Sequence, residues 1–111
     1  MSTLQFSRAA EGAVNIVALD GRLDNLTAAE FDKQVADLAG SRTVLDLAKL
    51  AYISSAGLRS VLSALKRANA EGGRLVVAGP APAIVEVFQI SGFITLIPVH
   101  ADRAAAVAAL S

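Results

Sequence analysis

Two periodicities of apolar residues alternate along the chain, one typical of strands and one typical of helices. Short apolar runs bounded by turn residues predict strands, at residues 4–8, 14–19, 43–47, 75–78 and 95–97. Apolar residues that recur three and four positions apart predict helices after the second and each later strand. The clearest helix begins near Ser55, continues to about Asn69 or Ala70, and carries the stripe Leu58, Val61, Leu62 and Leu65.

Turn and cap residues bound these predicted elements. Asp20-Gly21 is expected to end the second strand, and Pro98 the fifth. Residues 27–30, Thr-Ala-Ala-Glu, fit a capping box at the start of the first helix. Pro82 suits the first turn of the third helix, and Asp102 suits the N-cap of the last one. The pattern therefore predicts where each element begins and ends.

The predicted order is ββαβαβαβα, which indicates an α/β fold. The first two strands are expected to form a hairpin, whereas strands separated by helices imply right-handed crossovers and parallel pairing. Runs 43–47 and 75–78 are almost continuously apolar, as in strands that are buried on both faces. We therefore expect one domain over residues 1–111, with a mixed, mostly parallel central sheet flanked by helices.

Composition excludes several classes of function. The 111 residues include ten basic and ten acidic residues, so the formal net charge is zero and no basic surplus suggests nucleic-acid binding. No apolar run reaches the roughly 18 residues that a membrane span needs, so direct membrane insertion is not expected. The N-terminus does not resemble a signal peptide, which makes the cytoplasm the default location. The absence of cysteine excludes disulfides and thiol chemistry.

Signals for catalysis are weak, and we do not expect an enzyme. His100 is the single histidine, and metal sites need several clustered ligands. The serines at 54 and 55 are not part of a G-x-S-x-G motif, and no phosphate-binding or dinucleotide-binding glycine loop is present. Asp24 and Asp46 have no spacing that pairs them as acid and base. The sequence therefore implies neither a metal nor a cofactor.

The most informative segment is residues 52–59, Tyr-Ile-Ser-Ser-Ala-Gly-Leu-Arg, between a strand and a helix. We expect the Ser55 hydroxyl to cap this helix, or to accept a phosphate, since a helix N-terminus favours negative charge. Ser54 is the competing acceptor. Small Ala56 and Gly57 are expected to leave the surface open to a partner, with the alternative that Gly57 simply relieves crowding beside the sheet. Leu58 reads as the first core residue of the helix, and Arg59 is placed to pair with a phosphate one turn away.

Five ordered motifs resemble the STAS domain and, within it, the bacterial anti-anti-sigma factors, also called anti-sigma factor antagonists. They cover essentially the whole chain. The motifs are Gly21-Arg22-Leu23-Asp24, Val44-Leu45-Asp46-Leu47, Ile53-Ser54-Ser55-Ala56-Gly57-Leu58, Gly72-Gly73 and Ile90-Ser91-Gly92-Phe93. The resemblance implies the STAS fold and puts the family's phosphorylated serine on Ser55. Several family members have aspartate directly before that serine, where this chain has Ser54.

The resemblance also implies a partner switch. Unphosphorylated family members bind an anti-sigma factor and so free a sigma factor. The anti-sigma factor is often also the serine kinase, of the histidine-kinase-like ATPase fold, and a PP2C-type phosphatase restores the binding form. The partner-binding residues implied here are Asp24, Ser54, Ala56, Gly57, Leu58 and Arg59. Asp24 should lie at the C-terminal end of the second strand, on the same side of the sheet as Ser55, where it would contribute to the kinase-facing surface.

Two other functions remain open at this point. STAS domains also serve as accessory subunits of membrane transport ATPases, including bacterial lipid transporters, and in that role no serine need be phosphorylated. Ser55 would then be only a helix cap. A third reading is an adaptor in a larger signalling scaffold.

Overall fold

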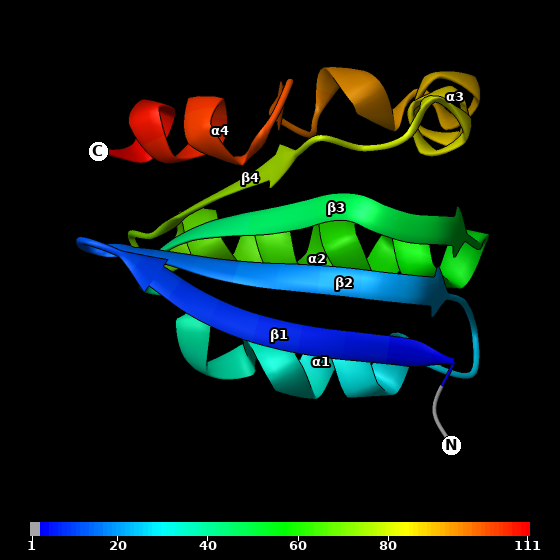
Figure 1. Ribbon diagram of the computed structural model, residues 1–111. Helices are drawn as coiled ribbons and strands as arrows, with labels where there is room; N and C mark the ends of the chain where they lie inside the picture. The colour runs from blue at the N-terminus through cyan, green and yellow to red at the C-terminus, as the bar shows by residue number, and fades with distance from the viewer. Residues whose placement is uncertain (1–2) are drawn as a thin grey trace.

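A mixed five-stranded sheet with helices on both faces forms the framework of the computed structural model, which describes residues 3–111 (Figure 1). In spatial order the strands are β1 (Leu4–Glu11), β2 (Val14–Leu23), β3 (Arg42–Ile53), β4 (Arg74–Ala78) and β5 (Val99–His100). The helices are α1 (Ala28–Val35), α2 (Ser55–Ala70), α3 (Pro82–Ser91) and α4 (Arg103–Leu110), with short 3-10 turns η1 (Ala36–Leu38) and η2 (Phe93–Thr95). Strand β1 is antiparallel to β2, and all later pairs are parallel. The predicted fold class is confirmed.

Alternate residues of the central strands enter two separate cores. On one face, Val17, Leu45 and Val77 pack in the larger cluster, which also contains buried residues of α1, α2 and α3. On the other face, Val44 and Val76 pack against α4. Figure 1 shows α4 beside β4, away from α1 and α2. The predicted burial of β3 and β4 on both faces is confirmed, and none of the helices between residues 3 and 111 is long and apolar enough to cross a bilayer.

The second and third strands are longer than the sequence pattern predicts. Asp20-Gly21 does not end β2, which continues to Leu23. The β2–β3 register shifts between Ala18 and Asp20 and again after Gly21, so this dipeptide lies in an irregular part of the ladder. Gly21 has a φ of 118°, and a Cβ there would lie 2.1 Å from the Thr3 carbonyl oxygen. Only glycine fits this close approach, which explains why a turn-like dipeptide stands inside a strand.

The prediction of a last strand at residues 95–97 is wrong. Those residues overlap the 3-10 turn η2, and β5 begins after Pro98 instead. The Pro98 carbonyl accepts a hydrogen bond from the Val77 amide at 2.8 Å. Proline has no amide to donate, but its carbonyl can still join the ladder, so it is tolerated just before a strand. By contrast, Pro82 in the first turn of α3 and Asp102 as the N-cap of α4 are confirmed.

Candidate functional site

Strands β2 and β3 end side by side, and this junction brings the predicted site residues together. Leu23 and Ile53 are partners in the parallel register. One residue later, the Ser54 amide donates to the Leu23 carbonyl oxygen at 2.9 Å. Asp24 follows Leu23 directly, so it lies at the same end of the sheet as Ser54. The expected C-terminal position of Asp24 is therefore what the structure has.

Ser54, and not Ser55, caps helix α2. Its backbone is extended, and its Oγ accepts a hydrogen bond from the Gly57 amide at 3.1 Å. Its carbonyl oxygen accepts from the Leu58 amide at 2.8 Å. The expectation that the Ser55 hydroxyl would be the cap is wrong by one residue, because β3 continues to Ile53 and the helix begins only at Ser55. Ser55 is the first helical residue, and its side chain is exposed.

Gly57 and Leu58 face the core rather than a partner. A Cβ on Gly57 would lie 2.5 Å from the Leu23 carbonyl oxygen and 2.8 Å from Leu23 Cγ. Leu58 is buried in the larger core. Of the two readings of Gly57, the open outer surface is wrong and the relief of crowding beside the sheet is confirmed, because the missing side chain lets α2 approach the end of β2. Ala56 is half-buried, and Arg59 is exposed.

Asp24 is buried and organises the turn between β2 and α1. Its Oδ1 accepts hydrogen bonds from the amides of Leu26 at 2.9 Å and Thr27 at 3.2 Å. The Thr27 hydroxyl accepts from the Asp24 amide and donates to the Arg22 carbonyl oxygen, both at 2.9 Å. Thr27 makes no side-chain bond to the first turn of α1, so the predicted capping box is wrong. Its hydroxyl is already engaged by the turn.

The carboxyl group of Asp24 is held in its charged form. Burial by itself raises the pKa of Asp24, but the hydrogen bonds from Leu26 and Thr27 and the nearby charge of Arg22 lower it more, and the pKa lies below its ordinary value. The Asp24 carboxylate thus accepts hydrogen bonds from its own turn, and its side chain, 13% exposed, leaves little for a partner to contact.

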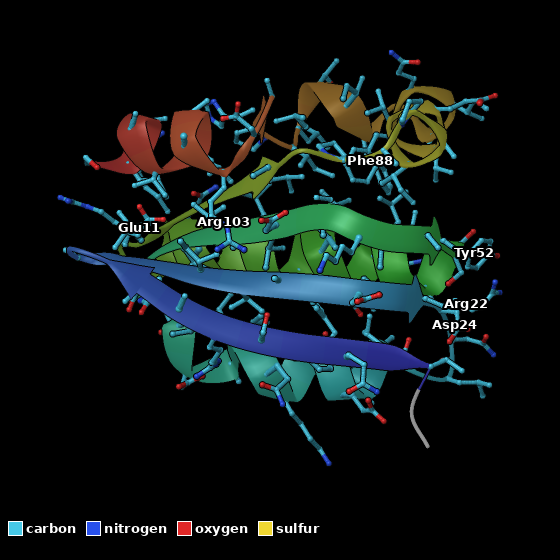
Figure 2. All side chains as sticks on the ribbon, viewed as in Figure 1. Glu11, Arg22, Asp24, Tyr52, Phe88 and Arg103 are labelled. Atoms are coloured by element: carbon cyan, nitrogen blue, oxygen red, sulfur yellow. The ribbon has the colours of Figure 1, made fainter. Side chains whose placement is uncertain are left out.

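An arginine and a tyrosine, paired across β2 and β3, complete the site. Arg22 and Tyr52 are register partners, and the Arg22 guanidinium carbon lies 4.2 Å from the centroid of the Tyr52 ring. Arg22 Nε is 3.7 Å from Asp24 Oδ2. Figure 2 shows Arg22, Asp24 and Tyr52 gathered at the end of the sheet where β2 and β3 stop. Sequence reasoning noted Tyr52 but missed Arg22; the signal was its place inside the Gly21–Asp24 motif.

Within the described residues, the site contains no cluster of side chains of the kind that holds a metal ion, since no three or more His, Asp or Glu side chains gather as metal ligands would. His100 lies in β5, at the edge of the sheet beyond β4. What the junction presents is an exposed hydroxyl on Ser55, next to exposed cationic and aromatic side chains.

Comparison with known proteins gives concordant results. The family described as Mlab, STAS domain matches residues 6–98. BtrV of Bordetella bronchiseptica, a protein assigned as an anti-sigma factor antagonist, is 42% identical over 97 residues, which cover 85% of this chain and 84% of BtrV.

Solved structures share the fold. An anti-sigma factor antagonist from Mycobacterium paratuberculosis has a TM-score of 0.87 at 19% identity, covering 96% of this chain and 93% of that one. The Bacillus cell fate determinant SpoIIAA, in its phosphorylated form, has a TM-score of 0.65 at 21% identity, covering 87% of this chain and 90% of that one. With the family match over most of its length and a relative at 42% identity, the chain belongs to the STAS domain family, among its anti-sigma factor antagonists.

Proposed function

We propose that this chain is an anti-sigma factor antagonist that is switched by phosphorylation of Ser55. In its unphosphorylated form it binds an anti-sigma factor, which is also a serine kinase of the histidine-kinase-like ATPase fold, and so frees a sigma factor. Phosphorylation ends this binding, and a PP2C-type phosphatase restores it. BtrV, the Bordetella relative assigned as an anti-sigma factor antagonist, and SpoIIAA, a neighbour solved in a phosphorylated form, support the proposal.

One observation carries the choice of Ser55: the two adjacent serines have different environments. The Ser54 hydroxyl is half-buried and holds the Gly57 amide. The Ser55 hydroxyl is exposed and makes no hydrogen bond within the described residues. A kinase must reach the hydroxyl and align it with the transferred phosphoryl group, so the free hydroxyl is the better acceptor. Ser54 keeps the capping role.

A phosphate on Ser55 would act without refolding the domain. It adds about −1.5 to −2 charge at the start of α2. The first backbone amides of a helix have no hydrogen-bond acceptor inside the helix. At the start of α2, the Gly57 amide donates to Ser54 Oγ and the Leu58 amide donates to the Ser54 carbonyl oxygen. The amides of Ser55 and Ala56 therefore remain to stabilise the new charge, and exposed Arg59 lies one turn along. A partner that packed over this point would have to desolvate the dianion, and each 1.4 kcal/mol lost is about tenfold in affinity.

The test combines variants of the two serines. Ser55→Ala, Ser55→Asp and Ser54→Ala would be compared with the unmodified chain as baits in lysate of the native cells, with captured proteins identified by mass spectrometry. We expect an ATPase-fold kinase on the unmodified chain and on Ser55→Ala, and its loss with Ser55→Asp. Incubation of the recovered kinase with ATP should phosphorylate the Ser54→Ala variant but not Ser55→Ala.

Two results would contradict the proposal. Equal capture of the kinase by the unmodified chain and by Ser55→Asp would show that charge at this position does not gate binding. Capture of transporter subunits by every bait, with no kinase, would move the chain to the class of transport accessory subunits.

A further inference from the structure

The guanidinium of Arg22 is held in place but has most of its hydrogen-bonding capacity unused. The Tyr52 ring supports it at 4.2 Å, and the nearest carboxylate oxygen, Asp24 Oδ2, is at 3.7 Å, too far for a good hydrogen bond. The guanidinium makes no hydrogen bond within the described residues, and the side chain is 52% exposed. Arginine has five donors in a planar fork that matches a carboxylate. The N–H donors of the Arg22 guanidinium are therefore available to a carboxylate of another molecule.

An apolar side chain is exposed in the turn that follows Arg22 and that Asp24 organises. Leu26 is 80% exposed, although its backbone is fixed by the bond from its amide to Asp24 Oδ1. Tyr52 is 41% exposed. Tyrosine and arginine are the residue types enriched at the energetic centres of protein interfaces, and an exposed leucine in the adjoining turn adds apolar area. Together Arg22, Leu26 and Tyr52 form what we call the Arg22 surface, adjacent to Ser54 and Ser55.

The exposed charge around the Arg22 surface is mainly positive. Segments 22–27 and 52–59 contain two arginines, Arg22 and Arg59, and one acidic residue, Asp24. The Asp24 carboxylate is buried and engaged by its own turn, so the exposed charge of these segments is positive. The chain as a whole is neutral. Arg22 has only a long ion pair with Asp24, at 3.7 Å, and Arg59 makes no ion pair within the described residues, so a partner that covers these two cations must bring negative charge.

We propose that the Arg22 surface docks an acidic segment of the partner protein, with a carboxylate on the Arg22 guanidinium and an apolar side chain against Leu26. The inference rests on the proposed function, since it specifies the chemistry of the same partner. It also explains why a phosphate at Ser55 is an effective block. The added dianion would face the acidic segment itself and would compete with it for Arg22 and Arg59.

The test is a titration followed by NMR of the backbone amides of the full chain. The probe is a short synthetic peptide that alternates glutamate with leucine, and the comparison peptide alternates lysine with leucine. We expect the acidic peptide alone to shift the amides of residues 22–26 and 52–55. Arg22→Glu should raise its Kd about tenfold or more, and added salt should weaken its binding to the unmodified chain.

The matched control is Arg74→Glu. Arg74 is exposed at the start of β4, and because β3 and β4 are parallel it lies at the opposite end of the sheet from Tyr52. The variant Arg74→Glu changes the charge by the same amount as Arg22→Glu. Because remote exposed charges are screened, it should leave the Kd of the acidic peptide within about twofold of the value for the unmodified chain. Spectra of both variants without peptide show whether the fold is kept, and Arg22→Lys tests the planar fork without changing the charge.

Equal weakening by Arg22→Glu and Arg74→Glu, or equal binding of the lysine peptide, would overturn the inference. The titration needs no anti-sigma factor, so its failure is distinguishable from failure of the proposed function. If capture of the kinase depends on Ser55 but the acidic peptide does not bind, only the acidic docking is refuted. If the peptide binds but no kinase is captured, the Arg22 surface stands and the proposed partner does not.

Discussion

Replacing Gly57 with alanine tests whether the start of α2 is fixed by its contact with the end of β2. Two effects oppose each other. An alanine inside a helix is more favourable than a glycine by about 1 kcal/mol. Against this, the new Cβ would lie 2.5 Å from the Leu23 carbonyl oxygen and 2.8 Å from Leu23 Cγ, both shorter than van der Waals contact.

The clash should be the larger effect. The Leu23 carbonyl oxygen also accepts the bond from the Ser54 amide at 2.9 Å, so it cannot move away without weakening the link between β2 and the cap of α2. Overpacking of this kind destabilises by about 1–3 kcal/mol, and a backbone atom is less able to yield than a side chain. Because the closest atom here belongs to the backbone, the upper part of that range, about 2–3 kcal/mol, applies, and subtracting the gain in helix propensity of about 1 kcal/mol leaves a net loss of about 1–2 kcal/mol in the free energy of unfolding. For a domain of this size, that lowers Tm by roughly 5–15 °C.

The assay is thermal and urea unfolding of the purified chain followed by circular dichroism. Gly40→Ala is the matched control, because Gly40 has an ordinary backbone conformation and its added Cβ would meet no atom closer than 3.7 Å. That variant should be neutral or slightly more stable, by up to about 1 kcal/mol, through the lower entropy of its unfolded chain. If Gly57→Ala were as stable as Gly40→Ala, the contact with Leu23 would not be what positions α2.

Three further predictions address the cap, the buried acid and a buried hydroxyl. Ser54→Ala should lose about 1 kcal/mol of stability with the cap, whereas Ser55→Ala should be within a few tenths of the unmodified chain in the same urea unfolding assay; equal losses would contradict the assignment of Ser54 as the cap. Because the folded-state pKa of Asp24 is lowered, its stabilising contribution is complete above the ordinary aspartate pKa of about 3.9 and is lost as the pH falls through the lower folded-state value. Asp24→Asn should therefore show a smaller fall of Tm with acidification, and an unchanged slope of Tm against pH would refute this. Thr43 is 1% exposed and its hydroxyl has no hydrogen-bond partner within residues 3–111, so Thr43→Val should raise stability by about 1 kcal/mol, and a loss in calorimetry would indicate an ordered water there.

Local pattern was sufficient for the order of elements, since apolar periodicity predicted the strands and helices. The position of Asp24 at the same end of the sheet as Ser55 came from the resemblance to the STAS domain, and the structure has it there. The cap of α2 was predicted one residue too late. Deciding between two adjacent serines requires knowing where β3 ends, and the irregular register between β2 and β3 near Gly21 sets the alignment of those strand ends. Pairwise register is not encoded in either strand alone.

The same limit explains why Arg22 was missed. The sequence around Arg22 does not distinguish it from any other exposed arginine. Its role at the site depends on the contact with Tyr52, its register partner in the neighbouring strand. Thr27 gives the reverse case, because a local capping pattern was present but a tertiary arrangement used its hydroxyl elsewhere. For Arg22 the deciding contact is with a residue distant in sequence, and for Thr27 it is a competing polar partner. In both cases the local sequence is compatible with more than one arrangement.

The order of the strands in the sheet has a consequence for how the chain is made. Spatial order and sequence order coincide from β1 to β5, so each strand pairs with the one synthesised just before it. A ribosome releasing the chain from its N-terminus would always present the next strand to an edge that already exists, and no segment would have to insert between two formed neighbours. Helix α4 follows all five strands in the chain and covers the face that carries Val44 and Val76. Until α4 has been synthesised, that face of the sheet stays open to water, so the smaller core forms only after the sheet is complete.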